Sequence, residues 1–186
     1  VRTALAMGAD DGIIINAEEK LDTYATAKAL AEAANQEGPY DMIFTGKLAI
    51  DDNAASVSQQ LGEFLNIPHT TVVSKFESDS NNVTVEREVE GGTKEIVQLN
   101  GPAVIGANKG LNQPRYASLP GIMKAKKKPL KEIEFSSLSV NIDDVKVTYS
   151  DYQLPPENPP VKMIDGDTTQ QVSELAKLLR EEAKVI

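Results

Sequence analysis

The segment best suited to ligand chemistry runs from Gly46 to Val57. It follows an apolar run typical of a buried strand, turns at Gly46 and is expected to open a helix, so it would lie at the carboxyl edge of a parallel sheet, where ligands bind. The first amides of that helix, from about Ala54, would lack acceptors and favour a phosphate. Two aspartates in the segment could accept hydrogen bonds from a ribose or an adenine amino group. The candidate nucleotide-binding residues are Gly46, Ala49, Asp51, Asp52, Asn53, Ala54, Ala55, Ser56 and Val57.

The same pattern also has an ordinary structural explanation. Residues 51–53, Asp-Asp-Asn, form a common N-terminal helix cap, and the segment matches neither a Walker loop nor a G-x-G-x-x-G turn. Other chemistry has less support. The single histidine, His69, has no Cys or second His to complete a metal site, and no Ser lies in a G-x-S-x-G elbow. Glu86 and Glu88 are more typical of a solvated strand face than of an acid–base pair.

A second candidate surface lies between Asn112 and Lys128, where apolar residues are mixed with a dense basic cluster. Leu119, Ile122 and Met123 could anchor a protein partner, with the lysines steering an acidic surface towards them. The alternative is a solvated basic run beside a core-facing Leu-Pro. Nucleic acid is a poor third option, because the chain is acidic overall and the basic run lacks interleaved aromatics.

The composition excludes several classes of function. The 186 residues carry 19 Lys+Arg and 28 Asp+Glu, a net charge of −9, and no Cys or Trp. Without cysteine the chain cannot form a disulfide, a thiolate zinc site or a thiol nucleophile. Its apolar fraction of 40% is normal for a globular protein, and no stretch approaches the ~18 continuous apolar residues of a membrane helix.

The hydrophobic periodicity predicts an α/β fold. Strands separated by helices at this spacing indicate right-handed βαβ crossovers and a parallel sheet, followed by a β-hairpin with a Gly-Gly turn, a further strand and a long loop. A Pro-rich extended linker then leads to a closing amphipathic helix. The expected strands are 12–16, 40–45, 69–76, 83–89, 94–99 and 102–107; the helices are 23–36, 51–65 and 167–184; the loop is 109–131 and the linker 154–160.

Residues 1–9 read as the last turns of a helix that stops at Gly8. A chain does not usually begin within an element, so we expect that an N-terminal piece precedes Val1.

Four stretches together closely resemble the beta subunits of the electron transfer flavoprotein family: residues 1–9, 46–52, 85–88 with the Gly-Gly turn, and 112–128. The matches are collinear to about Lys131. The most specific stretch is 114–127, PRYASLPGIMKAKK, whereas the tail is similar only in its plan. The resemblance implies a Rossmann-like, three-layer nucleotide-binding domain over residues 1–135, lacking the family's first strand and the loop after it, and a C-terminal arm and helix over 136–186 that dock on an alpha subunit.

The resemblance also implies a function. Such heterodimers carry electrons from flavin dehydrogenases, including the acyl-CoA dehydrogenases of fatty acid oxidation, to a membrane quinone oxidoreductase, without substrate turnover of their own. The redox FAD lies mainly in the alpha subunit, and the beta subunit holds a structural AMP. The implied setting is the bacterial cytoplasm or the mitochondrial matrix, with no metal, nucleic-acid partner or membrane insertion.

Individual residues take roles by the same resemblance. Glu88 matches a carboxylate that pairs with an alpha-subunit arginine near the flavin, and Leu119 matches the anchoring leucine of a recognition loop. Lys124 and Lys127 match lysines that are methylated in mitochondrial members. The implied partner-binding residues are Arg115, Tyr116, Leu119, Pro120, Ile122, Met123, Lys124 and Lys127.

Two features bear on which nucleotide is bound. Family members often carry Asn-Gln-Thr where this chain has Ala55-Ser56-Val57, which removes two polar side chains from the phosphate. Members that bifurcate electrons hold a second FAD in the beta subunit and tend to have Gly where Asp52 stands, so Asp52 favours AMP. A stand-alone ATP-binding stress-type domain is a remote alternative, because it gives no reason for the loop at 119–128 or the tethered helix.

Overall fold

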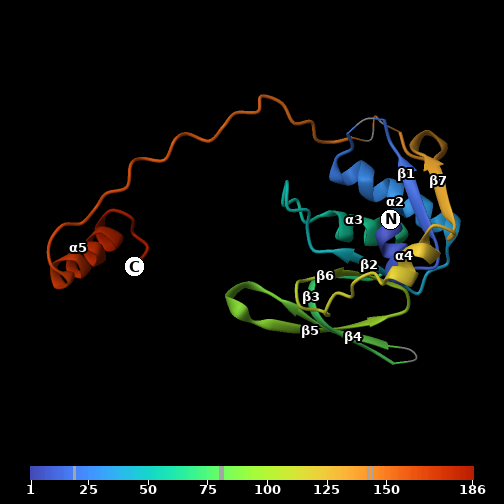
Figure 1. Ribbon diagram of the computed structural model, residues 1–186, viewed down its shortest axis with the longest axis horizontal. Coiled ribbons are helices and arrows are strands. Elements are labelled where there is room, and N and C mark those ends of the chain that lie inside the picture. Colours follow the sequence, from blue (N-terminus) through green and yellow to red (C-terminus); the bar gives the residue numbers. More distant parts are fainter. Residues whose placement is uncertain (19, 80–81, 142, 144) are drawn as a thin grey trace. The chain divides into compact units, whose positions relative to one another are not determined.

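The computed structural model describes residues 1–18, 20–79, 82–141, 143 and 145–186. The chain forms two compact units, Val1–Thr148 and Tyr149–Ile186. The first is a mixed α/β unit that carries all of the candidate site residues (Figure 1).

The larger of two sheets in the first unit has the order β2-β6-β3-β4-β5. β2, β6 and β3 form its parallel part, and β3, β4 and β5 form an antiparallel meander. The expected hairpin is confirmed, with Glu88 opposite Lys94 and positive φ angles of 74° at Gly91 and 76° at Gly92 in the turn. The strands of this larger sheet are β2 (Met42–Gly46), β3 (His69–Ser78), β4 (Asn82–Glu88), β5 (Lys94–Asn100) and β6 (Ala103–Ala107). The 3₁₀ turn η1 (Glu90–Gly92) lies between β4 and β5.

Among the described residues, the second sheet consists of β1 (Gly12–Asn16) and β7 (Leu130–Glu134), which pair in parallel. Strand and helix alternation is therefore as expected, but the parallel strands are divided between two sheets. The first unit also holds the helices α1 (Arg2–Met7), α2 (Thr23–Glu37), α3 (Val57–Leu65) and α4 (Leu119–Ala125) and the 3₁₀ turn η2 (Phe135–Ser137).

Helix α2 joins the two sheets because it is lined with alanine on more than one side. Ala29 and Ala33 pack with Ile133 over the β1–β7 sheet, while Ala31 packs with Leu61 of α3 and Val104 of β6. Methyl side chains allow close approach on both sides without loss of helix propensity. A third buried cluster, with Val73, Val85 and Ile105 among its members, is formed by residues of β3, β4, β5 and β6 in the larger sheet.

Two expectations about element boundaries are wrong. Residues 51–53 do not cap the third helix: α3 begins at Val57 after its N-cap Ser56, three residues later than the expected start at about Ala54. The expected loop over 109–131 instead contains α4 and the start of β7. The proline and glycine residues of this segment led to the prediction of a loop where there is a short helix. The first turn of α4 tolerates Pro120, because an N–H at that position would have no intrahelical acceptor.

The second unit consists of an extended segment and one helix, α5 (Thr168–Glu181). Asp167 forms the expected cap, a capping box in which its side chain accepts from the Gln170 N–H and the Gln170 side chain accepts from the Asp167 N–H. Among the described residues, no helix has the length and apolar character needed to cross a membrane.

Candidate functional site at the carboxyl edge of the sheet

The register of the strands gathers the candidate residues at one edge. Gly46, the last residue of β2, lies opposite Ala107 of β6, and Ala107 lies opposite Val73 of β3. Asn108 follows directly, with its N–H donating to the Val73 carbonyl at 2.8 Å. The loop after β2 and the turn after β6 therefore leave the sheet side by side, as the topology of a parallel sheet requires.

The loop of residues 47–56 is shaped by its own hydrogen bonds. The Asn53 N–H donates to the Ala49 carbonyl at 3.0 Å, and the Ala54 N–H donates to a carboxylate oxygen of Asp52 at 3.0 Å. Asn53 and Ala55 have left-handed φ angles of 53° and 48°. Such a conformation costs an alanine roughly 1–2 kcal/mol, and backbone strain of this kind clusters at binding sites.

The positive φ angles fall on Asn53 and Ala55, and the expectation that Gly46 would make the turn is wrong. Gly46 ends β2 with ordinary strand geometry, and apart from its two chain neighbours no described residue has an atom within 4 Å of the position a Cβ would take. The chain changes direction further along, where the Asp52 side chain and the Ala49 carbonyl bind the backbone.

The first turn of α3 offers unused hydrogen-bonding groups to an anion. Among the described residues, no side chain caps this helix, and its first intrahelical bond runs from the Gln60 N–H to the Ser56 carbonyl at 3.1 Å. The side chain of Gln59 donates to the Ala55 carbonyl at 2.9 Å, while its buried Oε1 has no partner in the described part of the chain. The free amides of this first turn thus fit a nucleotide phosphate, and Gln59 Oε1 next to them can accept a hydrogen bond.

Ser58 anchors the helix to the end of β2. Its hydroxyl lies 2.6 Å from Thr45 Oγ1 and donates to the Gly46 carbonyl at 3.3 Å. These bonds fix the N-terminus of α3 relative to the end of β2, and so they hold both ends of the loop of residues 47–56 in place.

Glu88 reaches the same edge from the antiparallel part of the sheet. Asn108 Nδ2 donates to Glu88 Oε2 at 2.7 Å, so the turn after β6 orients this carboxylate. Neighbouring Arg87 donates to the Thr71 carbonyl at 3.2 Å and pairs with Glu95 at 3.0 Å. Asn108 was not expected from the sequence, since nothing in its local pattern shows that the turn after β6 comes within hydrogen-bond distance of the end of β4.

Glu86, by contrast, belongs to a structural ion-pair cluster. It lies 3.3 Å from Lys75 Nζ and 3.3 Å from Lys94 Nζ, and hydrogen bonds from these two lysines hold the pKa of its carboxyl below the ordinary value. Bonds to Glu77 and Glu86 raise the pKa of Lys75. Glu86 and Glu88 therefore have different partners, in agreement with the solvated-face interpretation.

The second candidate surface is formed by α4 and the loop before it. Tyr116 is 97% exposed, Leu119 73% and Met123 66%, with Ile122 also exposed. Ser118 caps the helix by accepting the Gly121 N–H at 3.1 Å. A Cβ on Gly121 would lie 2.4 Å from the Ala6 carbonyl oxygen, so glycine is needed here for α4 to pack on α1. The remaining partner candidates, Arg115, Pro120, Lys124 and Lys127, are exposed beside them.

Lys128 does not contribute to that surface. Its ammonium donates to the Leu5 carbonyl at 3.1 Å and to the Ala9 carbonyl, so it binds the C-terminal end of α1. Arg2 donates in return to the carbonyls of Ala125, at 2.8 Å, and Lys128, at 3.2 Å. The exposed basic residues of α4 and its end are therefore Lys124, Lys126 and Lys127.

The chain is similar in sequence to a known family of proteins. The sequence profile of the electron transfer flavoprotein domain matches residues 1–138. The chain is 41% identical over 191 residues to the electron transfer flavoprotein subunit beta of Bacillus subtilis (strain 168), covering 100% of this chain and 74% of that protein. It is 41% identical over 188 residues to the mitochondrial subunit beta of Arabidopsis thaliana, covering 100% and 72%. The Mus musculus subunit beta is 40% identical over 161 residues, covering 84% and 62%.

Proposed function

This chain belongs to the electron transfer flavoprotein family and is related to its beta subunits, and we propose that it is the beta subunit of a heterodimeric carrier. The carrier takes electrons from flavin dehydrogenases, acyl-CoA dehydrogenases among them, and delivers them to a quinone oxidoreductase, with no substrate turnover of its own. The observation that carries this proposal is that the nucleotide loop and Glu88 lie at the same edge of the sheet. Gly46, which opens the nucleotide loop, lies opposite Ala107, and the next residue, Asn108, orients Glu88.

The nucleotide of this subunit is AMP, bound by the loop of residues 47–56 and the first turn of α3. The free amides around Ser56 and Val57 hold its phosphate, and Asp51 and Asp52 accept hydrogen bonds from its ribose or adenine amino group. One oxygen of Asp52 already accepts the Ala54 N–H, which leaves the other for the ligand. AMP has a structural role, joining the loop to the sheet edge.

The FAD would be held mainly by the alpha subunit, and Glu88 would pair with an arginine of that subunit near the flavin. Only Oε2 of Glu88 bonds to Asn108, so Oε1 is available to pair with an arginine of the alpha subunit near the flavin. A carboxylate so oriented would stabilise that arginine without itself reacting. The bound flavin supplies the redox chemistry.

The C-terminal unit docks on the alpha subunit. Val172 and Leu175 of α5 are exposed on one stripe, as suits a helix that binds another surface. Protease cleavage between Tyr149 and Gly166 should be fast in the free chain and slow in the heterodimer, as measured by mass spectrometry of the fragments. Equal cleavage rates would contradict the docking.

The cofactor content of the heterodimer tests the proposed function. The complex is purified, denatured, and its released nucleotides are separated by chromatography. One FAD and one AMP per heterodimer are expected. Two FAD and no AMP would instead indicate a bifurcating protein, and would show that Asp52 does not select AMP. A chain that retains one ATP and binds no alpha subunit would indicate the stand-alone domain.

A further inference from the structure

The side chain of Gln59 makes a hydrogen bond that the backbone of a longer helix would make. In a regular α-helix the N–H of residue 59 donates to the carbonyl of residue 55. Here Ala55 lies outside α3, and the first bond of this kind among the described residues runs from the Gln60 N–H to the Ser56 carbonyl. The Ala55 carbonyl instead accepts from Gln59 Nε2 at 2.9 Å. The Gln59 side chain therefore takes the place of a backbone donor.

This bond orients the peptide group between Ala55 and Ser56. The C=O and the N–H of a trans peptide point in opposite directions, so a carbonyl held towards Gln59 turns the Ser56 N–H away from α3. Asp52 fixes the chain on the other side, because one of its carboxylate oxygens accepts the Ala54 N–H at 3.0 Å. Ala55 is thus held from both sides, which accounts for its left-handed φ angle of 48°.

Phosphate binding at this site depends on backbone donors. Ala55 and Val57 have no polar side-chain atom. Within the described part of the chain, nothing accepts from the N–H groups of Ser56, Val57 and Ser58. Ser56 follows the left-handed residue with φ −123° and ψ −18°. Successive N–H groups on such a turn face one concave side, a nest that suits an anion.

We propose that Gln59 is a positioning residue for the phosphate of the nucleotide. By holding the Ala55 carbonyl, its side-chain amide aims the Ser56 N–H at the phosphate. This role rests on the AMP site proposed above, and Gln59 acts on the phosphate through the backbone rather than by contact. Gln59 Oε1 is buried without a partner among the described residues, which destabilises the fold. An apolar side chain of similar length would avoid that cost if the position were purely structural.

The first test replaces Gln59 with methionine, which has similar length and helix propensity but no amide. Without the bond, Ala55 should be left-handed only about a tenth of the time, as the cost of that conformation for alanine implies. Because only this fraction presents the Ser56 N–H to the phosphate, the affinity of the heterodimer for AMP should fall about tenfold. Isothermal titration of the nucleotide-free heterodimer with AMP measures the affinity.

Gln60→Met is the matched control. Gln60 is the next residue of α3, is half-buried like Gln59, and also has a buried Oε1 without a partner among the described residues. Of the two glutamines, only Gln59 donates to the loop of residues 47–56 in the part of the chain that the structure describes. Gln60→Met should therefore leave the affinity for AMP unchanged.

Ala55→Gly distinguishes positioning from direct contact. Glycine adopts a positive φ about as readily as a negative one. Without the Gln59 bond, about half of the molecules that carry Ala55→Gly should keep the Ser56 N–H in place, so Gln59→Met should weaken AMP binding only about twofold in that background. A direct contact between Gln59 and AMP would be lost equally in both backgrounds, because it does not depend on residue 55.

Three results would overturn the role of Gln59 alone. The first is unchanged affinity in Gln59→Met, and the second is an equal loss in Gln60→Met, which would indicate a general effect on α3. The third is an equal loss with and without Ala55→Gly, which would make Gln59 a direct contact. A wild-type heterodimer that binds no AMP is a separate outcome, since it would overturn the proposed AMP site and the role of Gln59 with it.

Discussion

At the scale of single residues, Asp22 joins two segments that are distant in sequence. One carboxylate oxygen caps α2 by accepting the Ala25 N–H at 2.8 Å. The other accepts the N–H groups of Lys146 at 2.6 Å and Val147 at 2.9 Å. Burial by itself would raise the pKa of Asp22, but these backbone donors outweigh it and lower the pKa below the ordinary value. Asp22 thus fixes where the chain leaves the compact unit.

Asp22→Asn should lower the free energy of unfolding by about 1–3 kcal/mol at neutral pH, because an amide cannot accept from both sets of donors. The folded-state pKa lies below the unfolded one. The carboxylate therefore stabilises the fold above the unfolded pKa of about 3.9, and this stabilisation is lost as pH falls through the folded pKa. Urea unfolding at pH 7 and pH 3 measures both effects, and the gap between wild type and variant should narrow at pH 3. Exposed Asp10→Asn is the control; a gap that does not change with pH would contradict the assignment.

Ser56→Asp should weaken AMP binding by about tenfold or more, because its carboxylate would repel the phosphate. A repulsion of about 1.4 kcal/mol is enough for a tenfold loss of affinity. Aspartate is also a good N-cap, so α3 should be retained or slightly stabilised. Isothermal titration with AMP and thermal unfolding measure the two effects. The matched control is Ser118→Asp at the N-cap of α4, which should leave AMP affinity unchanged. Unchanged affinity in Ser56→Asp would place the phosphate elsewhere.

Sequence reasoning at this scale succeeded where the signal is local. The exposure of Leu119 and Met123 follows from their place in a basic, Pro-containing stretch. The left-handed conformation of Ala55 could not be predicted, because alanine rarely adopts it and only the surrounding bonds impose it. The hydrogen bonds between Lys128 and α1, and between Asp22 and the backbone of residues 146–147, join residues more than a hundred positions apart in the sequence. A local sequence pattern therefore cannot predict them.

At the scale of elements, α4 presents its apolar side chains outward because its small residues face inward. Ala125 is buried and Gly121 approaches α1, which leaves Leu119 and Met123 on the opposite side. Such exposed apolar side chains on a short, well-capped helix suit a transient protein contact.

Leu119→Ala should slow electron transfer from a dehydrogenase about tenfold, which corresponds to the loss of about 1.4 kcal/mol of docking energy. Stopped-flow reduction of the heterodimer by an acyl-CoA dehydrogenase measures the rate. Flavin content and unfolding free energy should be unchanged, since Leu119 is 73% exposed. Ile96→Ala is a matched control, because Ile96 is 75% exposed and belongs to β5. Equal rates for wild type and Leu119→Ala would exclude this docking role.

Element boundaries were harder to predict than element order. Strands β1, β2 and β3 and helices α2 and α5 lie close to their expected ranges, because each has a clear apolar period and a capping or breaking residue. The start of α3 was placed too early because Asp51, Asp52 and Asn53 form turn hydrogen bonds as readily as they cap a helix.

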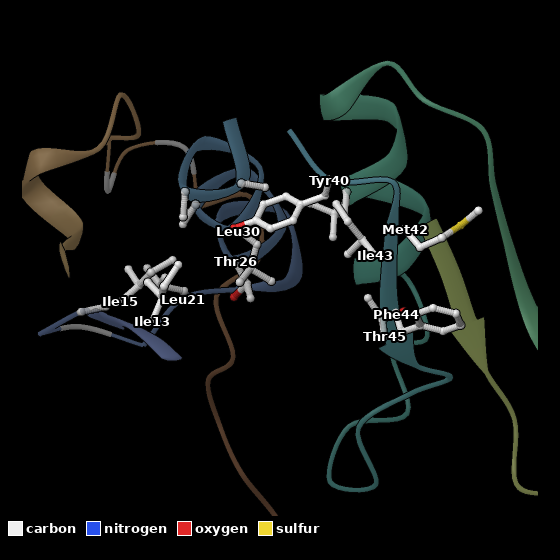
Figure 2. Close-up of a pocket in the computed structure, with 15 residues that line it drawn as sticks. Ile13, Ile15, Leu21, Thr26, Leu30, Tyr40, Met42, Ile43, Phe44 and Thr45 are labelled. Carbon is white, nitrogen blue, oxygen red and sulfur yellow. The ribbon is translucent and has the colours of Figure 1, made fainter. Parts of the chain in front are cut away.

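At the scale of the whole chain, the division into two sheets could not be predicted. The apolar character of β1 and β2 predicts strands that are buried on both faces, as in a parallel sheet that is covered by helices. In this structure β1 and β2 belong to different sheets and line one apolar pocket of about 640 Å³ (Figure 2), and Phe44 is 53% exposed. The apolar pattern of a strand predicts how buried it is, but the pattern does not specify which strands pair with it.

Charge is also distributed unevenly over the chain, and this gives a prediction about ionic strength. The net charge is −9, yet Lys124, Lys126 and Lys127 are exposed together next to the apolar residues of α4. If these lysines steer an acidic dehydrogenase surface, the second-order rate of electron transfer should fall as salt increases from about 0.02 to 0.2 M, where the screening length shortens roughly threefold. Lys127→Gln should flatten this dependence. Lys75→Gln should not, because Lys75 lies on the hairpin and is paired with Glu77 and Glu86. A rate that does not depend on salt would mean that apolar contacts alone direct the docking.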